Sequence, residues 1–470
     1  MRSLGRAGVE VHAFTESPRV PLARSAYLHR PHPMPGASAG TRAAADEAAV
    51  AALDRAGARI GRRAVLIAMD DRAALLAARL PERVRSRFLL ADVGPALPER
   101  LADKSELVSL CSEFGIAHPR TEQPESLAEV RRAVARLGLP LIAKWSRPWR
   151  LPPDAGLRST TPVRSEAEAL NLYERSAEAG SSLLLQRLLP GRPGADWFFH
   201  GCFGADGRLL AGGTGRKELS WPVGAGLTAA GSWLPHAQLT RDAMRLAQRL
   251  GYRGILDLDF RWDPDTGAYH LLDANPRPGA QFRLFTDLSG IDVVRALHLD
   301  LTGRSVPDTR PVPGRMFVAE NYAPVSALLT ARNRRVGPAP RPPIPGRRSI
   351  EPAWFAPDDL APFLAMAAHT ARRAAQRLTL PSAGAVRRPA APSHRGAGRR
   401  VPSVGTPAVR ATATGRRAAG RTPAGGGAPV ADASPEPSPT AARAEPAPPS
   451  APRSNTPETT GTSRKVSGDY

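Results

Sequence analysis

The sequence predicts a mixed α/β protein with several domains, and three observations support this fold class. Short apolar runs alternate with helical segments along the chain, a β-hairpin is evident at 255–274, and the composition changes abruptly after Pro381. The chain has 470 residues, of which 42% are hydrophobic, and this suffices for the cores of about two or three domains. We therefore expect a folded region followed by a tail of a different kind.

A small parallel α/β domain is predicted for residues 1–100. Strand-like apolar runs occur at 9–14, 64–69 and 87–90, and a helical segment at 71–80 separates the last two. Strands that alternate with helices in this way are typical of a parallel sheet. Because the chain opens inside a helical segment, we expect the first strand of this domain to be missing.

Residues 101–305 contain the polar motifs, and a subdomain is expected within them at about 120–188. Helices are predicted at 126–137 and 165–179, because a serine opens each segment and can accept hydrogen bonds from the free N–H groups of the first turn. A third helix is predicted at 240–250, with a glycine as its stop.

The remaining residues divide at Pro381. Residues 306–380 are predicted to form a terminal subdomain with a helix at 358–378. Residues 381–470 consist largely of Ala, Pro, Gly, Arg, Ser and Thr, and they have too few large apolar side chains to bury a core. We therefore expect a disordered tail.

The stretch 255–281 is the most informative about function. It reads ILDLDFRWDPDTGAYHLLDANPRPGAQ, in which two alternating runs flank a Pro/Gly turn. Pairing across this turn places Asp259 beside Asp273. Like carboxylates repel, and charges within an apolar frame are costly to bury, so a cation between them is expected. Asn275 adds a third oxygen ligand, and oxygen ligands suit Mg²⁺ (or Mn²⁺), while Arg277 offers a planar fork for an anion. The plainer alternative is a surface hairpin with solvated acids.

Lysine is rare in this chain. Lys and Arg together number 65, but only Lys104, Lys144, Lys217 and Lys465 are lysines. A lysine provides a compact, mobile charge that suits phosphate groups. We therefore expect that the few lysines in this arginine-rich chain have a function that arginine could not serve. Chance survival is the alternative, and it is our explanation for Lys465.

These motifs together resemble the ATP-grasp superfamily. Its metal-binding hairpin usually reads acid-Phe-x-x, a turn, then Glu-x-Asn-x-Arg, and here both acids are Asp. The segment 103–121 resembles the start of the family's ATP-binding region, and Lys144 and Lys217 resemble the basic positions that meet the phosphates from two sheets. The resemblance covers about residues 9–370 and is strongest at 101–290.

The resemblance also implies nucleotide-binding roles. The strand at 182–191 resembles the family's hinge, whose backbone reads the adenine edge, and Asp196 matches an acid that often binds ribose hydroxyls; its alternative is an ordinary turn residue. The subdomain at 120–188 would be the lid, although its loop at 145–165 has a single glycine, Gly156, where the family has several. The residues thus assigned to the nucleotide are Lys104, Lys144, Gln186, Arg187, Leu188, Leu189, Asp196 and Lys217.

A carboxylate–amine ligase is the function that the resemblance implies. ATP and Mg²⁺, held by Asp259, Asp273 and Asn275, would phosphorylate a small-molecule carboxylate, and an amine would attack the acylphosphate beside Arg277 and Lys217. Dimers are frequent in this superfamily, so a homodimer is an option. The alternatives are an enzyme similar to biotin carboxylase or carbamoyl-phosphate synthase, with bicarbonate as the acid, and a non-catalytic ATP-binding protein whose basic tail contacts polyanions.

Composition argues against several other classes of protein. The net charge of +22 comes from arginine that accompanies abundant Ala, Gly and Pro, and no nucleic-acid-reading motif accompanies it, so no specific nucleic-acid partner is expected. No apolar run approaches the ~18 residues of a membrane span, and no signal peptide opens the chain. Cys111 and Cys202 stand alone, which fits a reducing cytoplasm.

Overall fold

The computed structural model describes residues 1–15, 17, 19–34, 41–152, 155–224, 226–308, 310–333 and 349–379. All of these residues lie within one compact unit, Met1–Val386. The tail predicted at 381–470 lies outside the described residues.

The N-terminal segment contains two small parallel sheets, β1–β2 and β3–β4, and this agrees with the predicted parallel α/β pattern. The strand expected at 64–69 is shorter than predicted, since its pairing with β4 covers only Ala64 and Val65. The elements are α1 (Arg2–Gly5), β1 (His12–Thr15), η1 (Pro21–Arg24), β2 (Arg30–Pro33), α2 (Arg42–Ile60), β3 (Ala64–Val65), α3 (Asp71–Ala78), α4 (Glu82–Arg85) and β4 (Phe88–Leu89).

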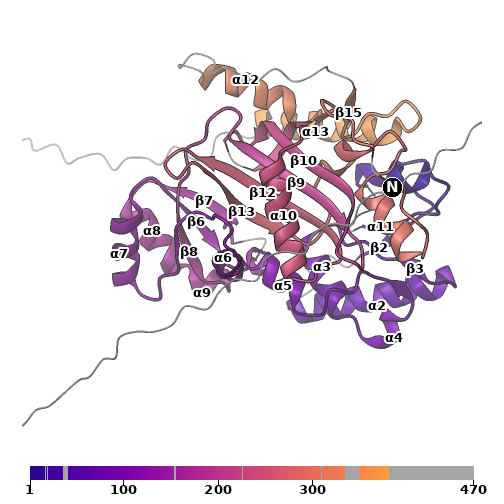
Figure 1. Ribbon diagram of the computed structural model, residues 1–470, viewed down its shortest axis with the longest axis horizontal. Helices are drawn as coiled ribbons and strands as arrows, with labels where there is room; N and C mark the ends of the chain where they lie inside the picture. Colours follow the sequence, from indigo (N-terminus) through magenta and orange to yellow (C-terminus); the bar gives the residue numbers. More distant parts are fainter. Residues whose placement is uncertain are drawn as a thin grey trace, which may run out of the picture. The chain divides into compact units, whose positions relative to one another are not determined.

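An antiparallel four-stranded sheet with the order β5-β8-β6-β7 follows, and α7 and α8 lie beside it (Figure 1). Ser126 and Ser165 cap α7 and α8 as predicted. The carboxylate of Asp103 caps α6, so Lys104 is the first residue of that helix. The elements are α5 (Leu97–Ala102), α6 (Lys104–Phe114), β5 (Thr121–Glu122), α7 (Leu127–Leu137), β6 (Leu141–Trp145), η2 (Pro148–Arg150), β7 (Thr160–Val163), α8 (Glu166–Glu174), α9 (Ser176–Ala179) and β8 (Leu183–Arg187).

A seven-stranded sheet with the order β13-β12-β9-β10-β11-β14-β15 forms the centre of the fold (Figure 1). All of its neighbouring strands are antiparallel except β14 and β15. The helix predicted at 240–250 begins three residues earlier, because His236 caps it. The elements are β9 (Asp196–Phe203), β10 (Leu209–Trp221), β11 (Leu227–Trp233), α10 (Ala237–Arg249), β12 (Gly254–Asp263), β13 (Ala268–Asn275), η3 (Phe282–Phe285), α11 (Val293–Leu301), β14 (Met316–Val318), α12 (Ala323–Asn333), β15 (Ile350–Pro352) and α13 (Ala361–Thr379).

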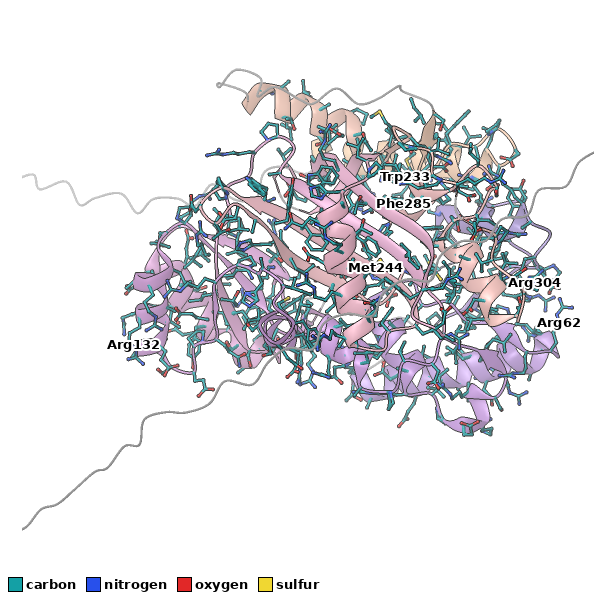
Figure 2. The ribbon with its side chains drawn as sticks, in the orientation of Figure 1. Arg62, Arg132, Trp233, Met244, Phe285 and Arg304 are labelled. Carbon is teal, nitrogen blue, oxygen red and sulfur yellow. The ribbon has the colours of Figure 1, made fainter. Side chains whose placement is uncertain are left out.

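The two faces of the central sheet have separate apolar cores. Leu256 and Leu258 of β12 pack with α6 and α10, whereas Ile255 packs with α1 and α11 on the opposite face. A third cluster lies towards β14, where the rings of Trp233 and Phe285 meet edge to face with centroids 5.1 Å apart (Figure 2). Within the described part of the chain, no helix combines the length and apolar character that a bilayer crossing requires.

A buried carboxylate ties the N-terminal helix to the segment before α13. Asp359 accepts hydrogen bonds from Arg2 Nε, Ser25 Oγ and the backbone N–H of Ala26, each at 2.8 Å. Burial opposes ionisation of Asp359, but these donors outweigh it and lower its pKa below the ordinary value of 3.8. The residue therefore stabilises the fold as a carboxylate.

Replacing Asp359 with Ala is expected to lower the free energy of unfolding by about 3–5 kcal/mol, because Arg2 loses its buried partner. The stabilisation by ionised Asp359 is complete above the pKa that this residue has in the unfolded chain, and it is lost as the pH falls through the lower pKa of the folded protein. The difference in unfolding free energy between wild type and variant should therefore shrink below about pH 4. Urea denaturation at pH 7 and at pH 3 measures this. Asp358→Asn is the matched control, since Asp358 is exposed and pairs with Arg6 at the surface.

Candidate functional site

The β12–β13 hairpin presents a polar face that agrees with the predicted pairing. In the register of the two strands, Asp259 lies opposite Asp273, and Asp257 lies opposite Asn275. Alternate residues such as Leu256 and Leu258 turn into the core. Three carboxylates and one amide therefore share a single face of the hairpin.

Two lysines neutralise the paired acids. The Lys104 ammonium group, at the start of α6, forms an ion pair with Asp273. The Lys217 ammonium group, on β10, lies 3.2 Å from Asp259 Oδ1 and donates a second hydrogen bond to the carbonyl of Gly226 at 3.2 Å. Each carboxylate thus has its own lysine, which comes from a different element of the fold.

Lys144 reaches the same hairpin from the four-stranded sheet. It projects from β6, and its Nζ donates to the carbonyl of Leu272 at 3.0 Å. Burial lowers the pKa of this ammonium to about 8. The three lysines expected at the site therefore converge on the hairpin from α6, β6 and β10.

The pKa values of the two paired acids, Asp259 and Asp273, are shifted in opposite directions. Burial raises the pKa of Asp259, and repulsion from Asp257 and Asp273 adds to this effect, although Lys217 opposes it. Burial acts in the same direction on Asp273, but Lys104 and Lys144 outweigh it and lower the pKa of that carboxyl. Asp273 is accordingly the acid that carries a charge most firmly.

Arg277 and Asn275 belong to an adjoining buried cluster. Arg277 Nε donates to Asp71 Oδ1 at 2.9 Å, and its NH2 group donates to Asn275 Oδ1 at 3.2 Å. Asn275 Nδ2 in turn lies 3.4 Å from Asp257 Oδ2. Arg277 thus connects the end of the hairpin to helix α3 of the N-terminal segment.

Asp257 also contacts a histidine that is fully shielded from solvent. His200 of β9 is 0% exposed, and its Nε2 lies against Asp257 Oδ1. Gly279 passes so close to this pair that a Cβ atom there would overlap both side chains. The loop after the hairpin therefore requires glycine at this position, and it closes over the His200–Asp257 pair.

The predicted hinge residues lie at the end of β8 and just beyond it. Gln186 is buried and donates to Thr121 Oγ1 at 2.8 Å. The side chain of Arg187 is held by Asp263, with NH1 donating at 2.8 Å. Gln186 lines a narrow pocket together with Lys104 and Lys144, and the other lining residues are Leu107, Val108, Cys111, His118, Leu184, Leu271 and Leu272. This pocket brings Gln186, a predicted hinge residue, together with two of the lysines.

Leu188, Leu189 and Asp196, which are also predicted to contact the nucleotide, follow β8. Leu188 is half-buried and Leu189 is buried. Asp196 accepts two hydrogen bonds from Arg261, at 2.5 and 3.0 Å. Both oxygen atoms of the Asp196 carboxylate are thus bound by Arg261 of β12.

The hairpin face has the chemistry of a site for a divalent cation. Asp259 and Asp273 lie directly across from each other and offer carboxylate oxygens, and Asn275 lies two residues after Asp273 with its Oδ1 accepting from Arg277. The raised pKa of Asp259 reflects its burial and its repulsion by nearby carboxylates, and a bound cation would offset this repulsion and stabilise the ionised carboxylate. The residues therefore fit Mg²⁺ or Mn²⁺.

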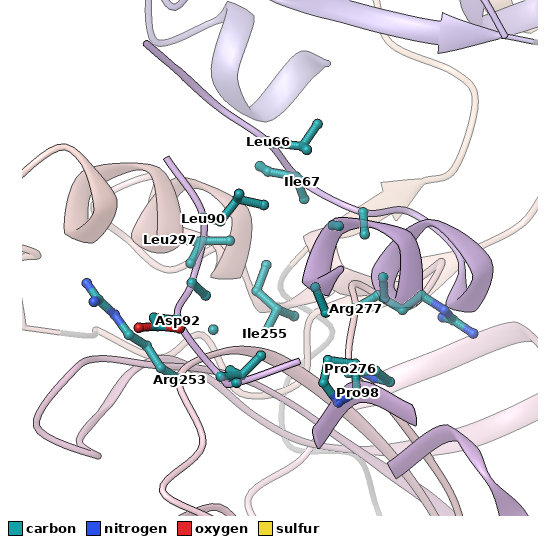
Figure 3. A pocket seen from close by; sticks show the side chains of 18 of the residues that line it. Leu66, Ile67, Leu90, Asp92, Pro98, Arg253, Ile255, Pro276, Arg277 and Leu297 are labelled. Carbon is teal, nitrogen blue, oxygen red and sulfur yellow. The ribbon is translucent and has the colours of Figure 1, made fainter. Parts of the chain in front are cut away.

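A second, larger pocket lies beside Arg277 (Figure 3). It has a volume of about 270 Å³ and lies between the β3 and β4 region and the end of the hairpin. Its walls are mostly apolar, with Leu66, Ile67 and Leu297 among them, and Arg277 contributes a charged group. The pocket can hold a small molecule that has an apolar part and an anionic part.

Sequence reasoning missed Asp257, His200 and Asp71. Asp257 carried a usable signal, because it is two residues before Asp259 and must share its strand face. His200 stands alone in the apolar run WFFHGCF, where a polar residue needs a partner. Nothing in the local sequence links Asp71 to Arg277, since 206 positions separate them.

Comparisons with known proteins agree with this architecture. No protein-family model matches the chain. The carbamoyl phosphate synthase large chains of Deinococcus deserti and Deinococcus radiodurans are each 28% identical to it over 211 residues, which cover 40% of this chain and 19% of theirs. The chain therefore spans about a fifth of the length of the curated relatives it matches.

Two solved structures share the fold. The biotin carboxylase of Campylobacter jejuni, solved as a complex with beta-gamma-ATP, has a TM-score of 0.51 at 13% identity, and the match covers 67% of this chain and 70% of that one. The biotin carboxylase domain of Hydrogenobacter thermophilus 2-oxoglutarate carboxylase, a dimer solved with MgADP, ADP and bicarbonate, has a TM-score of 0.50 at 15% identity and coverages of 66% and 69%. These matches, together with the mixed sheet and its hairpin, show that the chain has the ATP-grasp fold.

Proposed function

We propose that this protein is an ATP- and Mg²⁺-dependent ligase that joins a carboxylate to an amine through an acylphosphate. The observation that carries the proposal is the convergence of Lys104, Lys144 and Lys217 on one hairpin that bears paired carboxylates. Lys104 and Lys217 pair with Asp273 and Asp259, and Asp257 pairs with His200 and Arg277, so among the described residues Lys144 is left without a carboxylate partner of its own. This arrangement favours the binding of a further anion, and a triphosphate has the required charge.

The lysines have distinct tasks in this proposal. Lys104 and Lys217 hold the two acids in the free protein, and both exchange carboxylate for phosphate oxygens when MgATP binds. Lys144 stays at the hairpin backbone, where its buried charge meets the phosphates from the lid side. Asp259, Asp273 and Asn275 would hold Mg²⁺, which when bound neutralises and orients the phosphate oxygens.

The pocket beside Arg277 supplies space for the acid. Arg277 orients the carboxylate, whose oxygen forms a bond to the γ-phosphorus as the bond to ADP breaks. The amine nitrogen then forms a bond to the carbonyl carbon, inorganic phosphate leaves, and the amine loses a proton. Positioning and charge neutralisation suffice for both steps, so no side-chain nucleophile is required.

A second candidate takes bicarbonate as the acid. The observation that favours it is the sequence similarity to carbamoyl phosphate synthase large chains over 211 residues. Bicarbonate would enter the same acylphosphate chemistry, and Arg277 would hold it in place of a larger carboxylate. A cytoplasmic enzyme with small-molecule substrates is expected in either case, and the dimer of the Hydrogenobacter domain makes a homodimer a reasonable assembly.

Product analysis tests the proposal. Purified protein with MgATP should release ADP and phosphate only when an acid and an amine are both supplied, and a panel of ¹⁸O-carboxylates and ¹⁸O-bicarbonate should transfer one ¹⁸O atom to the phosphate. Transfer from bicarbonate alone selects the second candidate. Formation of AMP and pyrophosphate, or tight MgATP binding without acid-dependent turnover across the panel, would contradict a ligase of this type.

A further inference from the structure

We propose that Glu10, His12 and His29 form a binding site for a transition-metal ion of the zinc class on the N-terminal segment. One carboxylate oxygen and one ring nitrogen from each histidine lie within 4.8 Å of one another. These residues lie at or next to β1 and β2 and are not part of the hairpin site. The inference therefore does not depend on the proposed ligase activity.

The distances between the ligand atoms suit a single ion. His12 Nε2 lies 2.8 Å from Glu10 Oε1, and His29 Nε2 lies 3.5 Å from the same oxygen. Ligands at about 2.0–2.2 Å from a tetrahedral zinc ion are separated by roughly 3.3 Å, so small side-chain adjustments bring all three to the ion. Two imidazoles and one carboxylate form a common ligand set for zinc, and they leave a fourth position open to water.

Neighbouring groups already orient the ligands. His12 Nδ1 lies 2.8 Å from Nε2 of His32, which is only 4% exposed, so a proton on His12 Nδ1 leaves its Nε2 lone pair free for a metal. Arg62 donates to Glu10 Oε2 at 2.7 Å and leaves Oε1 turned towards the imidazoles. Arg62 lies at the surface (Figure 2), where solvent screens its charge.

The site is open enough to exchange its ion. The side chain of His29 is 57% exposed and that of Glu10 is 37% exposed, whereas that of His12 is 14% exposed. His29 and Glu10 lie at the surface and His12 lies beneath them, so an ion can reach all three without local unfolding. The parallel pairing of β1 and β2 fixes the positions of His12 and His32, since His12 is opposite Arg30 and Phe14 is opposite His32.

Calorimetric titration of the metal-free, full-length protein with Zn²⁺, in excess Mg²⁺, tests the site. One equivalent of Zn²⁺ should bind to the wild type, with at least about 100-fold weaker binding in His12→Ala and in His29→Ala. His32→Ala should weaken binding by about 10- to 100-fold, because it removes only an orienting contact. Co²⁺ in place of Zn²⁺ should give the visible absorption of a four-coordinate ion in the wild type.

Two controls make the outcome decisive. His369→Ala, which changes an exposed histidine of α13, and Asp273→Asn, which changes the hairpin, should both keep the full Zn²⁺ affinity. His29 is exposed, so His29→Ala should retain the wild-type thermal unfolding of the metal-free protein. Wild type that binds no Zn²⁺, or His12→Ala and His29→Ala variants with unchanged affinity, would overturn the proposal and leave an ordinary hydrogen-bonded cluster.

Discussion

Asp273→Asn is expected to reduce acid-dependent ATP turnover by at least about 10²–10³-fold while the protein remains folded. Lys104 and Lys144 lower the pKa of Asp273, whereas that of Asp259 is raised, and an amide cannot replace the charge of Asp273 at a cation. The change also removes the partner of Lys104, which leaves a buried ammonium unpaired. Steady-state phosphate release over a range of Mg²⁺ concentrations measures the effect.

The matched control is Asp265→Asn in the turn of the same hairpin. Asp265 is 69% exposed, and its carboxylate faces Arg187 rather than the lysines. Its turnover should stay within about two-fold of wild type. Equal turnover in Asp273→Asn and wild type would remove the hairpin carboxylates from the mechanism, and thermal unfolding of both variants distinguishes lost chemistry from lost structure.

Lys144→Met should weaken MgATP binding by at least about 2 kcal/mol, or roughly 30-fold. The variant keeps an apolar side chain of similar length in a half-buried position but loses the charge and the hydrogen bond to Leu272. Lys144→Arg should also bind MgATP less tightly, because a planar guanidinium is larger and needs a different geometry. Isothermal titration calorimetry measures both affinities.

Lys465→Met is the control for this experiment, because we attribute the survival of that lysine to chance. Its affinity for MgATP should equal that of the wild type. An unchanged affinity in Lys144→Met would mean that Lys144 serves the packing of the four-stranded sheet against the hairpin and does not meet the nucleotide.

Local chemistry made much of the fold predictable. The Pro/Gly turn and the alternation around it predicted the hairpin, but the opposition of Asp259 and Asp273 also requires the register shift between Asp259 and Phe260, without which Leu272 would lie opposite Asp259. Serine caps predicted the starts of α7 and α8.

The site was less predictable, because its contacts join residues that are far apart in the sequence. The scarcity of lysine in the sequence pointed to Lys104, Lys144 and Lys217. The atoms that these lysines contact, however, depend on how the four-stranded and the seven-stranded sheet pack together. The pairing of Arg277 with Asp71 likewise depends on the docking of the N-terminal segment, which no local pattern encodes. Roles for Leu188 and Leu189 rest on family resemblance and stay predictions.

The most direct test of the hairpin site is a crystal structure with Mn²⁺ and a non-hydrolysable ATP analogue, measured at the manganese absorption edge. Our account predicts an anomalous peak between the carboxylates of Asp259 and Asp273, with the triphosphate in contact with Lys104, Lys144 and Lys217. A nucleotide bound elsewhere, or a manganese peak absent from this face of the hairpin while the lysines stay on the carboxylates, would contradict it.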